Sequence, residues 1–264
     1  MSGVLADILA RKREDVAAAK READVAELRD RAAAAEAPRG FAQALARRVE
    51  QGQLAVIAEI KRRSPSAGAL RPDDDVAARA KSYEQGGAAC LSVLTDAPFF
   101  GGSAADLQEA RAAVPLPVLR KDFIIDAWQV HETRALGADC MLLIAAALPP
   151  DLLAELAGLG RELGLDVLVE VHAEEELEAA RRAEASLVGI NNRDLRSMTI
   201  DLAVTERLAP LLAADGRLLV AESGVATAAD AARARAAGAG ALLVGEALMR
   251  AEEPAALLAD LASA

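Results

Sequence analysis

The sequence lacks the long apolar segments that membrane-spanning helices need. Its longest uninterrupted apolar run, residues 140–148, has nine residues, whereas a helix that crosses a bilayer needs about 20. Near the N-terminus, acidic and basic side chains such as Asp7, Arg11 and Glu14 alternate without a sustained apolar stretch after them. We therefore expect a soluble protein without a signal peptide.

Cysteine is scarce too, and the chain has no excess of positive charge. Its two cysteines, Cys90 and Cys140, both lie in apolar runs, which favours buried thiols over a disulfide or a metal site and predicts a cytoplasmic location. The 30 basic and 41 acidic side chains give a formal charge of −11. This balance argues against a general nucleic-acid or membrane-surface binder, because phosphate groups attract positively charged proteins.

What the chain does contain is enough apolar surface for a large core. Of its 264 residues, 53% are hydrophobic and 27% are charged, a composition that excludes disorder as the main state. Eight short apolar runs start about 20 to 35 residues apart, with Ala-, Glu- and Arg-rich stretches of helical spacing between them. This alternation predicts parallel strands joined by crossover helices. The runs are residues 54–60, 89–94, 118–120, 140–145, 167–171, 187–190, 218–221 and 241–244.

Eight such units can form either a closed barrel or an open nucleotide-binding sheet. An open sheet usually has a glycine-rich loop after its first strand, but this sequence contains neither GxGxxG nor GxxxxGK. We therefore predict an α/β protein, a (β/α)8 TIM barrel that forms a single domain over residues 1–264. Residues 1–50 precede the first run and are expected to form an N-terminal helical extension, with Leu5 and Val25 among its buried positions and nothing chemically distinctive in it.

Charged residues stand at the ends of several predicted strands, where the active site of such a barrel lies. Glu59 and Glu170 interrupt very apolar runs, and a buried ionised carboxylate is costly unless a cation pairs with it. Any one of these residues alone is more often a surface residue, but together they predict a network at one mouth. The candidates are Glu59, Lys61, Lys121, Phe123, Glu170, Asn191, Arg193 and Glu222.

Small residues after the last two runs suggest a phosphate site. Ser223-Gly224 and Gly245-Glu246 place backbone N–H groups where an anion can approach them, and barrels often bind phosphate there. Each pair alone is equally well explained by a tight turn that needs glycine. The two pairs together favour phosphate binding.

Other polar features carry less weight. We expect His131 to be a partly exposed structural residue and Trp128 to be a packing residue. His172 could reach the mouth, but a single histidine without partners is more often structural than catalytic. The acidic run at residues 73–75 is typical of a helix start, because three adjacent side chains cannot all face one ion. No metal site is predicted.

Six motifs in this order resemble those of the indole-3-glycerol phosphate synthase family of tryptophan biosynthesis, over the whole chain. Trp128 and His131 stand where the family commonly has aromatic residues such as tyrosine, and Ala247 stands where serine is frequent, but none of these is a motif residue expected to carry chemistry. The motifs are EIKRRSPS at 59–66, LRKDF at 119–123, VEVH at 169–172, GINNRDL at 189–195, AESG at 221–224 and VGE at 244–246.

The resemblance implies the conversion of 1-(2-carboxyphenylamino)-1-deoxyribulose 5-phosphate to indole-3-glycerol phosphate, with loss of carbon dioxide and water and without a cofactor. It implies that Lys121 is the general acid at the ketone, Glu170 the base or acid of the dehydration, and Lys61 a second acid. Arg62 and Arg63 would join the lysines in a basic island that attracts the anionic substrate. The other implied roles are catalytic support by Glu59, Asn191 and Glu222, substrate binding by Ser64, Ser66, Phe123 and Arg193, and phosphate binding by Ser223, Gly224, Gly245 and Glu246.

Two alternatives stay open. One is another phosphate-binding barrel enzyme, an isomerase or an aldolase in which Lys121 forms a Schiff base. The other is a barrel that binds phosphorylated metabolites without chemistry. In each case we expect a small anionic phosphorylated partner, no nucleic acid, no membrane and a monomeric chain, and association with other enzymes of the tryptophan pathway is left open.

Overall fold

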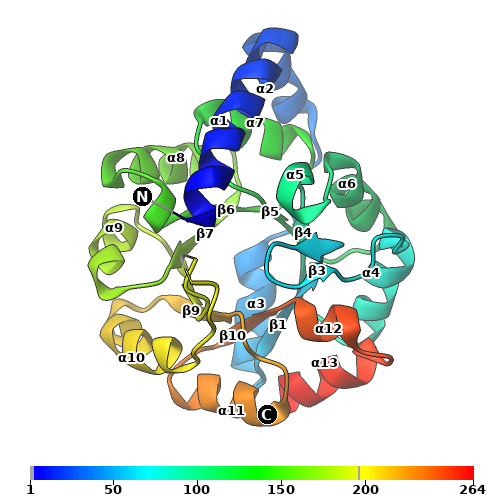
Figure 1. The fold of residues 1–264 in the computed structure, drawn as a ribbon, viewed down its shortest axis with the longest axis vertical. Helices are drawn as coiled ribbons and strands as arrows, with labels where there is room; N and C mark the ends of the chain where they lie inside the picture. Colours follow the sequence, from blue (N-terminus) through cyan, green and yellow to red (C-terminus); the bar gives the residue numbers. More distant parts are fainter. Residues whose placement is uncertain (1–2, 196) are drawn as a thin grey trace.

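Eight parallel strands form a closed barrel in the computed structural model, which describes residues 3–195 and 197–264 (Figure 1). Neighbouring strands follow the order β1-β10-β9-β8-β7-β6-β5-β4. Each strand coincides with one predicted apolar run to within two residues, so the predicted (β/α)8 barrel is confirmed. The strands are β1 (Ala55–Ile60), β4 (Cys90–Leu94), β5 (Val118–Lys121), β6 (Cys140–Ile144), β7 (Asp166–Val171), β8 (Leu187–Asn191), β9 (Leu218–Glu222) and β10 (Ala241–Val244).

Helices cover the outside of the barrel. Their apolar faces pack against outward-facing strand residues in two large buried clusters. Ser103, Asp126 and Thr227 accept hydrogen bonds from the first turns of three of these helices. The helices are α4 (Val76–Gln85), α5 (Ala97–Phe100), α6 (Ala104–Ala113), α7 (Ala127–Ala135), α8 (Pro150–Glu162), α9 (Leu177–Arg182), α10 (Ala203–Leu212), α11 (Ala228–Ala236), α12 (Glu246–Arg250) and α13 (Pro254–Ser263), with short 3-10 turns η1 (Ala145–Ala147), η2 (Glu174–Glu176) and η3 (Ala213–Asp215). None of the helices in the described part of the chain is both long and apolar enough to span a membrane.

The N-terminal residues form three helices before β1: α1 (Val4–Glu22), α2 (Val25–Ala34) and α3 (Phe41–Glu50). Asp24 accepts a hydrogen bond from Ala26 N and so starts α2 as a new helix. The chain turns at this point, and α1 and α2 both contact α7 (Figure 1). Leu5 and Val25 are half-buried rather than buried, and residues 1–2 lie outside the described residues.

The amino-terminal end of the barrel is closed by α3. Phe41 and Leu45 are fully buried against inward-facing strand residues such as Ala55 and Ile57, and α3 crosses the middle of the ring of strands in Figure 1. The N–H of Ala42 also donates to the Asp166 carboxylate at 2.9 Å. Hydrocarbon therefore fills most of the interior at this end, and the Asp166 carboxylate lies where β7 begins.

A small hairpin that the sequence did not predict follows β1. It consists of β2 (Arg63–Ser64) and β3 (Gly68–Ala69), which pair antiparallel around a tight turn. Gly68 has a φ of +68° there, a conformation that glycine adopts without steric cost. The hairpin places Ser64 and Ser66 beside the carboxyl end of the barrel.

Candidate active site

Charged side chains replace hydrocarbon at the carboxyl-terminal end of the barrel interior. Successive strand residues point to opposite faces, so residues two positions beyond an inward-facing apolar side chain also face inward. Glu59 follows Ile57 in this way, and Glu170 follows Leu168. Glu59, Glu170 and Glu222 are each no more than 4% exposed. The structure therefore brings the predicted strand-end residues together at one mouth.

Lys121 is the centre of this arrangement. Its Nζ lies 2.8 Å from Glu170 Oε2 and 2.9 Å from Glu222 Oε2. Burial lowers the pKa of Lys121, but the charges of Glu170 and Glu222 outweigh burial and raise this pKa above its ordinary value. Lys121 is therefore an ammonium at neutral pH.

The two carboxylates around Lys121 differ in their protonation. Burial raises the pKa of Glu170, but the charges of Lys121 and His172 outweigh it and hold this pKa well below its usual range. For Glu222, burial together with the neighbouring Glu170 charge outweighs the attraction of Lys121 and raises the pKa to about 8. At pH 7 Glu170 is ionised and Glu222 holds a proton, which is how two close carboxyl groups avoid mutual repulsion.

Two glycines make room for the carboxylates. A Cβ atom on Gly189 would lie 2.0 Å from Glu222 Oε1, and one on Gly245 would lie 2.3 Å from Glu59 Oε1. No real side chain tolerates such distances, so glycine at these two positions lets the carboxylates lie against the backbone. Glu59 in turn accepts a hydrogen bond from Lys61 Nζ at 2.6 Å.

Asn191 fixes the orientation of Glu170. Its Nδ2 donates to Glu170 Oε1 at 3.1 Å, and its Oδ1 accepts from the N–H of Arg193 at 3.0 Å. The Arg193 guanidinium donates to Met198 O and lies 3.8 Å from a Glu246 carboxylate oxygen. Arg193 thus spans the gap between the loops after β8 and β10.

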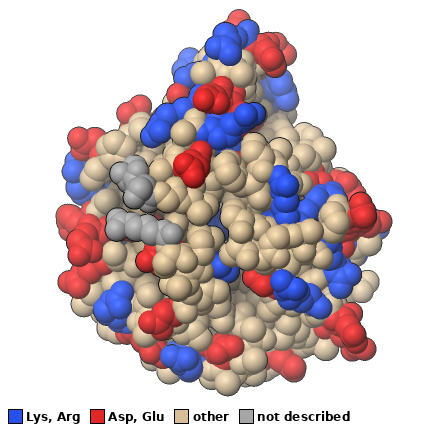
Figure 2. All heavy atoms as spheres, in the orientation of Figure 1, with Lys and Arg blue, Asp and Glu red and all other residues tan. Residues whose placement is uncertain are grey.

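A cavity of about 110 Å³ opens above these charges. Phe100 and Phe123 form an aromatic side of it, with ring centroids 6.0 Å apart. Figure 2 shows acidic and basic side chains around the outline of this face and a small opening with basic atoms near its middle. The predicted site residues that line the cavity are Glu59, Lys61, Ser64, Ser66, Lys121, Phe123, Glu170, Asn191 and Arg193.

A larger cavity of about 710 Å³ lies beside the first and shares Asn191, Arg193 and Leu195 with it. Lys121 and Glu170 line only the smaller cavity. Chemistry that uses these two side chains therefore belongs to the smaller one.

The four residues predicted to bind phosphate lie at the same end of the barrel but do not line the 110 Å³ cavity. Ser223 and Gly224 follow β9 with φ angles of 61° and 85°, and a non-glycine residue rarely adopts the former. Gly245 and Glu246 begin α12, and a Cβ atom on Gly245 would lie 3.2 Å from Lys61 Nζ. Gly245 and Glu246 therefore lie next to Lys61.

Arg62 and Arg63 do not belong to the site, so the predicted basic island is smaller than expected. Arg62 pairs with Asp106 at 2.7 Å, and Arg63 donates to the carbonyl oxygens of Ala97 and Pro98. Arg62 therefore contacts α6 and Arg63 contacts α5, next to the β2-β3 hairpin.

His172 has partners that the sequence analysis missed. Its Nε2 lies 3.2 Å from Glu170 Oε1 and its Nδ1 lies 3.5 Å from Glu176 Oε2. Burial lowers the pKa of His172, but these two carboxylates outweigh burial and raise it to about 10. The sequence does hold a signal for these contacts. Glu170 stands two residues before His172, on the same side of the strand, and Glu176 stands four residues after it. His131 likewise differs from expectation, because it is buried.

Among the residues that the structure describes, neither free thiols nor a metal-binding group of side chains lies at this site. Cys90 and Cys140 are free and buried in the barrel interior, as predicted. Within residues 3–195 and 197–264, no group of His, Cys, Asp and Glu side chains has the arrangement of a metal site.

Comparison with known proteins gives one consistent family. The family model described as indole-3-glycerol phosphate synthase matches residues 5–261. The indole-3-glycerol phosphate synthase of Laribacter hongkongensis is 51% identical over 261 residues, which cover 99% of both chains. That of Rhodospirillum rubrum is 52% identical over 251 residues, which cover 95% of both chains.

Solved structures show the same architecture. Tryptophan synthase subunit alpha from Legionella pneumophila superposes with a TM-score of 0.62 at 14% identity, covering 86% of this chain and 97% of that one. Thiamine phosphate pyrophosphorylase from Pyrococcus furiosus gives a TM-score of 0.59 at 16% identity, covering 79% of this chain and 93% of that one. At these identities the two structures indicate a common fold and nothing further.

Proposed function

We propose, since this chain belongs to the indole-3-glycerol phosphate synthase family, that it closes the indole ring of 1-(2-carboxyphenylamino)-1-deoxyribulose 5-phosphate. Carbon dioxide and water leave, and indole-3-glycerol phosphate is formed. The chain is thus a carboxy-lyase of tryptophan biosynthesis. The observation that carries the assignment of residues is the ammonium of Lys121 held between Glu170 and Glu222 above an apolar barrel floor.

In the first step, Lys121 acts as the general acid. The ring carbon that bears the carboxylate attacks the ketone carbon, and the ketone oxygen takes a proton from the Lys121 ammonium. An alkoxide is a stronger base than an amine, so this transfer is favourable even from a lysine whose pKa is raised. Loss of carbon dioxide then restores the aromatic ring.

In the second step, a hydroxyl group leaves as water and the five-membered ring becomes an indole. Glu170 is ionised, so it can accept the proton that the pyrroline ring must lose. Lys61, which lines the same cavity and is oriented by Glu59, is placed as the second acid for the departing hydroxyl. Glu222 accepts a hydrogen bond from Lys121 and holds it in place, and Asn191 donates one to Glu170 and orients it.

Different residues bind the aromatic ring and the anionic groups of the substrate. Phe123 contacts the substrate's aromatic ring, and Arg193 and Lys61 attract its charges. Ser64 and Ser66, 3.3 Å apart between their hydroxyl oxygens, shape the hairpin over the substrate. The phosphate lies on the backbone N–H groups of Ser223, Gly224, Gly245 and Glu246, because the Glu246 carboxylate itself would repel it.

The direct experiment is incubation of the purified protein with the anilino-deoxyribulose phosphate in the presence of EDTA. We expect indole fluorescence to rise with the release of one equivalent of carbon dioxide. A substrate that stays intact, or one that disappears without an indole product, contradicts the proposed function.

The Schiff-base alternative is disfavoured by the state of Lys121. An amine must lose its proton to attack a carbonyl carbon, whereas two carboxyl groups hold this one as an ammonium. Treatment with borohydride in the presence of the substrate should leave Lys121 unmodified. A stable adduct on Lys121 would favour the alternative.

We further propose that the chain is one monomeric domain of the cytoplasm. Two free buried thiols suit a reducing compartment. Among the described residues, the large hydrophobic side chains that are exposed, Val49, Ile200 and Leu211, are few, and a stable dimer usually needs a continuous apolar patch. Light scattering that gives twice the mass of 27.4 kDa would contradict the monomer.

A further inference from the structure

Lys12 is a charged residue on the buried face of α1. The buried residues of this helix are Ile8, Leu9, Lys12 and Val16, a spacing that places them on one side of the helix. Lys12 is only 7% exposed. The expectation that the N-terminal extension carries nothing chemically distinctive is therefore wrong at this position.

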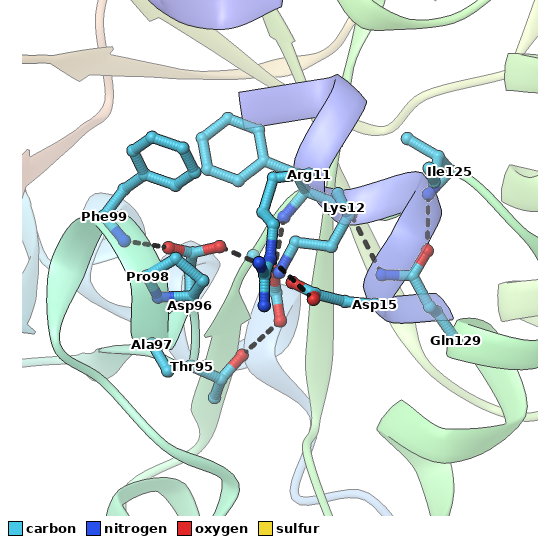
Figure 3. A network of polar contacts seen from close by, with 12 residues as sticks. Arg11, Lys12, Asp15, Thr95, Asp96, Ala97, Pro98, Phe99, Ile125 and Gln129 are labelled. Atoms are coloured by element: carbon cyan, nitrogen blue, oxygen red, sulfur yellow. Dashed lines mark hydrogen bonds and ion pairs between the residues drawn. The ribbon is translucent and has the colours of Figure 1, made fainter. Parts of the chain in front are cut away.

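The ammonium of Lys12 joins two loops at the carboxyl end of the barrel. Its Nζ lies 2.9 Å from Asp96 Oδ2 and 2.8 Å from Asp122 Oδ1, and both carboxylates are no more than 3% exposed. Figure 3 shows Lys12 reaching from α1 toward the loop that carries Asp96. Asp96 follows β4 and Asp122 follows β5, so one side chain from outside the barrel holds both loops.

Each carboxylate also orders its own loop. Asp96 accepts a hydrogen bond from the N–H of Phe99 at 2.9 Å and so caps α5, whose last residue is Phe100. Asp122 accepts from the N–H of Phe123 at 2.7 Å and from Thr95 Oγ1 at 2.6 Å. The two loops thus carry the aromatic side of the active-site cavity, and Asp122 directly follows Lys121.

We propose that Lys12 is a positioning residue for the aromatic side of the active site. It does not line the cavity, and it acts through Asp96 and Asp122 on Phe100 and Phe123. The functional part of this inference rests on the proposed function, because the substrate's aromatic ring is what these phenylalanines would contact.

Loss of the Lys12 charge leaves the two carboxylates in an unfavourable position. Asp122 keeps Arg120 Nη2 at 3.1 Å, whereas the described residues supply Asp96 with no other ion pair. Removal of one partner from a buried ion pair leaves an uncompensated charge, and a buried carboxylate then tends to move toward water. The loops that carry Phe100 and Phe123 would move with it.

The experiment compares Lys12→Met with Lys20→Met. Lys20 provides a matched control, because it lies on the same helix and pairs at 2.7 Å with Asp126 in the loop after β5, but its side chain is 41% exposed. In Lys12→Met we expect KM to rise about tenfold while kcat changes less than about threefold, because binding of the ring is lost but the reacting groups remain. In Lys20→Met both constants should stay within about twofold of the wild type, as is usual for an exposed pair.

A second readout does not depend on activity. Hydrogen exchange at the amides of Phe99 and Phe123 should be faster in Lys12→Met than in the wild type and unchanged in Lys20→Met, because these amides donate to the two carboxylates. Equal exchange in the two variants overturns the inference. If the wild type makes no indole product, the proposed function fails, and the exchange measurement still decides the role of Lys12.

Asp96→Asn separates charge from folding. Asparagine still caps a helix, but it removes one of the two charges that Lys12 balances. We expect the double variant Lys12→Met/Asp96→Asn to recover at least half of the rise in KM, and additive effects would contradict the inference.

If Lys12→Met does not fold, Asp96→Asn alone should raise KM about threefold. Asp126→Asn, the matched change at the exposed pair, should leave KM unchanged. Equal KM values in these two variants overturn the inference.

Discussion

The two ends of this barrel are built from the same eight strands, yet one holds hydrocarbon and the other holds charge. At the amino end, Phe41 and Leu45 pack on Ala55 and other small or aliphatic residues. At the carboxyl end, a single step of two residues along a strand leads from an apolar side chain to a charged one. The steps are Ile57 to Glu59, Leu119 to Lys121, Leu168 to Glu170 and Val220 to Glu222.

The difference shows how the fold separates stability from chemistry. The apolar layer below Lys121 and Glu170 excludes water from their lower side, and charges interact more strongly where water is scarce. The same layer makes a buried charge costly unless it is paired, which explains why each amine here contacts a carboxylate. Changes at the charged end should therefore alter turnover, and changes at the apolar end should alter stability.

The largest effect is expected from Lys121→Ala and Glu170→Gln. Each should lower kcat by about 100-fold or more, the usual contribution of a positioned acid or base. Steady-state kinetics with the anilino-deoxyribulose phosphate measure this, and circular dichroism checks that the barrel is folded. Near-normal turnover in either variant would remove that residue from its role.

At the opposite end, Leu45→Ala should affect stability alone. Leu45 is fully buried, and truncation of such a leucine costs about 2–5 kcal/mol of unfolding free energy through lost contacts and a cavity. Urea unfolding measures the loss, and kcat and KM should stay within about twofold of the wild type below the transition. A large change in KM would show that the two ends are coupled.

A smaller effect on turnover is expected from Gly189→Ala. The added methyl group would lie 2.0 Å from Glu222 Oε1 and displace the carboxyl group that holds Lys121. Since a displacement of about 1 Å at a catalytic group can cost about 100-fold, we expect a partial shift to lower kcat about tenfold.

Gly158→Ala is the matched control for that variant. Gly158 lies in α8 with no atom within 4 Å of an added Cβ, and alanine in a helix is favoured over glycine by about 1 kcal/mol. Unchanged kcat with slightly higher stability is the expected result. If Gly189→Ala behaves in the same way, the close approach of Glu222 is contradicted.

The last effect concerns the dependence of stability on pH and not turnover. The pKa of His172 is about 10 in the folded protein against an ordinary value of 6.5, so between these values the folded protein holds a proton that the unfolded chain releases. Stability should therefore fall as pH rises through this window. Glu222, with a pKa of about 8 against 4.5, adds a fall of the same sign between pH 4.5 and 8.

His172→Gln separates the histidine contribution between pH 8 and 9.5, because Glu222, with a pKa of about 8, titrates over this range in the wild type and in the variant alike. Urea unfolding between pH 8 and 9.5 should show a flatter decline for the variant than for the wild type. Parallel declines would mean that His172 does not keep its proton through contact with Glu170 and Glu176.

The eight strands and much of the charged end of the barrel could be predicted from the sequence. The eight short apolar runs at regular spacing identified all eight strands, because a strand buried on both faces needs an uninterrupted apolar stretch. Glu59 and Glu170 were conspicuous because they break such stretches. A two-residue period places Lys61 on the same side as Glu59 and Phe123 on the same side as Lys121.

The rest depended on distant partners that local patterns do not reveal. The strands of the β2-β3 hairpin have two residues each, too few for an alternating pattern. Arg62 and Arg63 share a motif with Lys61, but tertiary partners such as Asp106 turn them away. Lys12 was missed because a lysine on an Ala-rich helix is ordinarily exposed, and its two aspartates lie on other elements.

A crystal structure of the Lys121→Ala variant with its unreacted substrate tests most directly that chemistry is confined to the charged end. We predict the aromatic ring against Phe123, the ketone oxygen within hydrogen-bonding distance of the place that Lys121 Nζ occupies, and the phosphate on the N–H groups after β9 and β10. A substrate bound instead in the neighbouring 710 Å³ cavity, with its ketone away from Glu170, would contradict this arrangement.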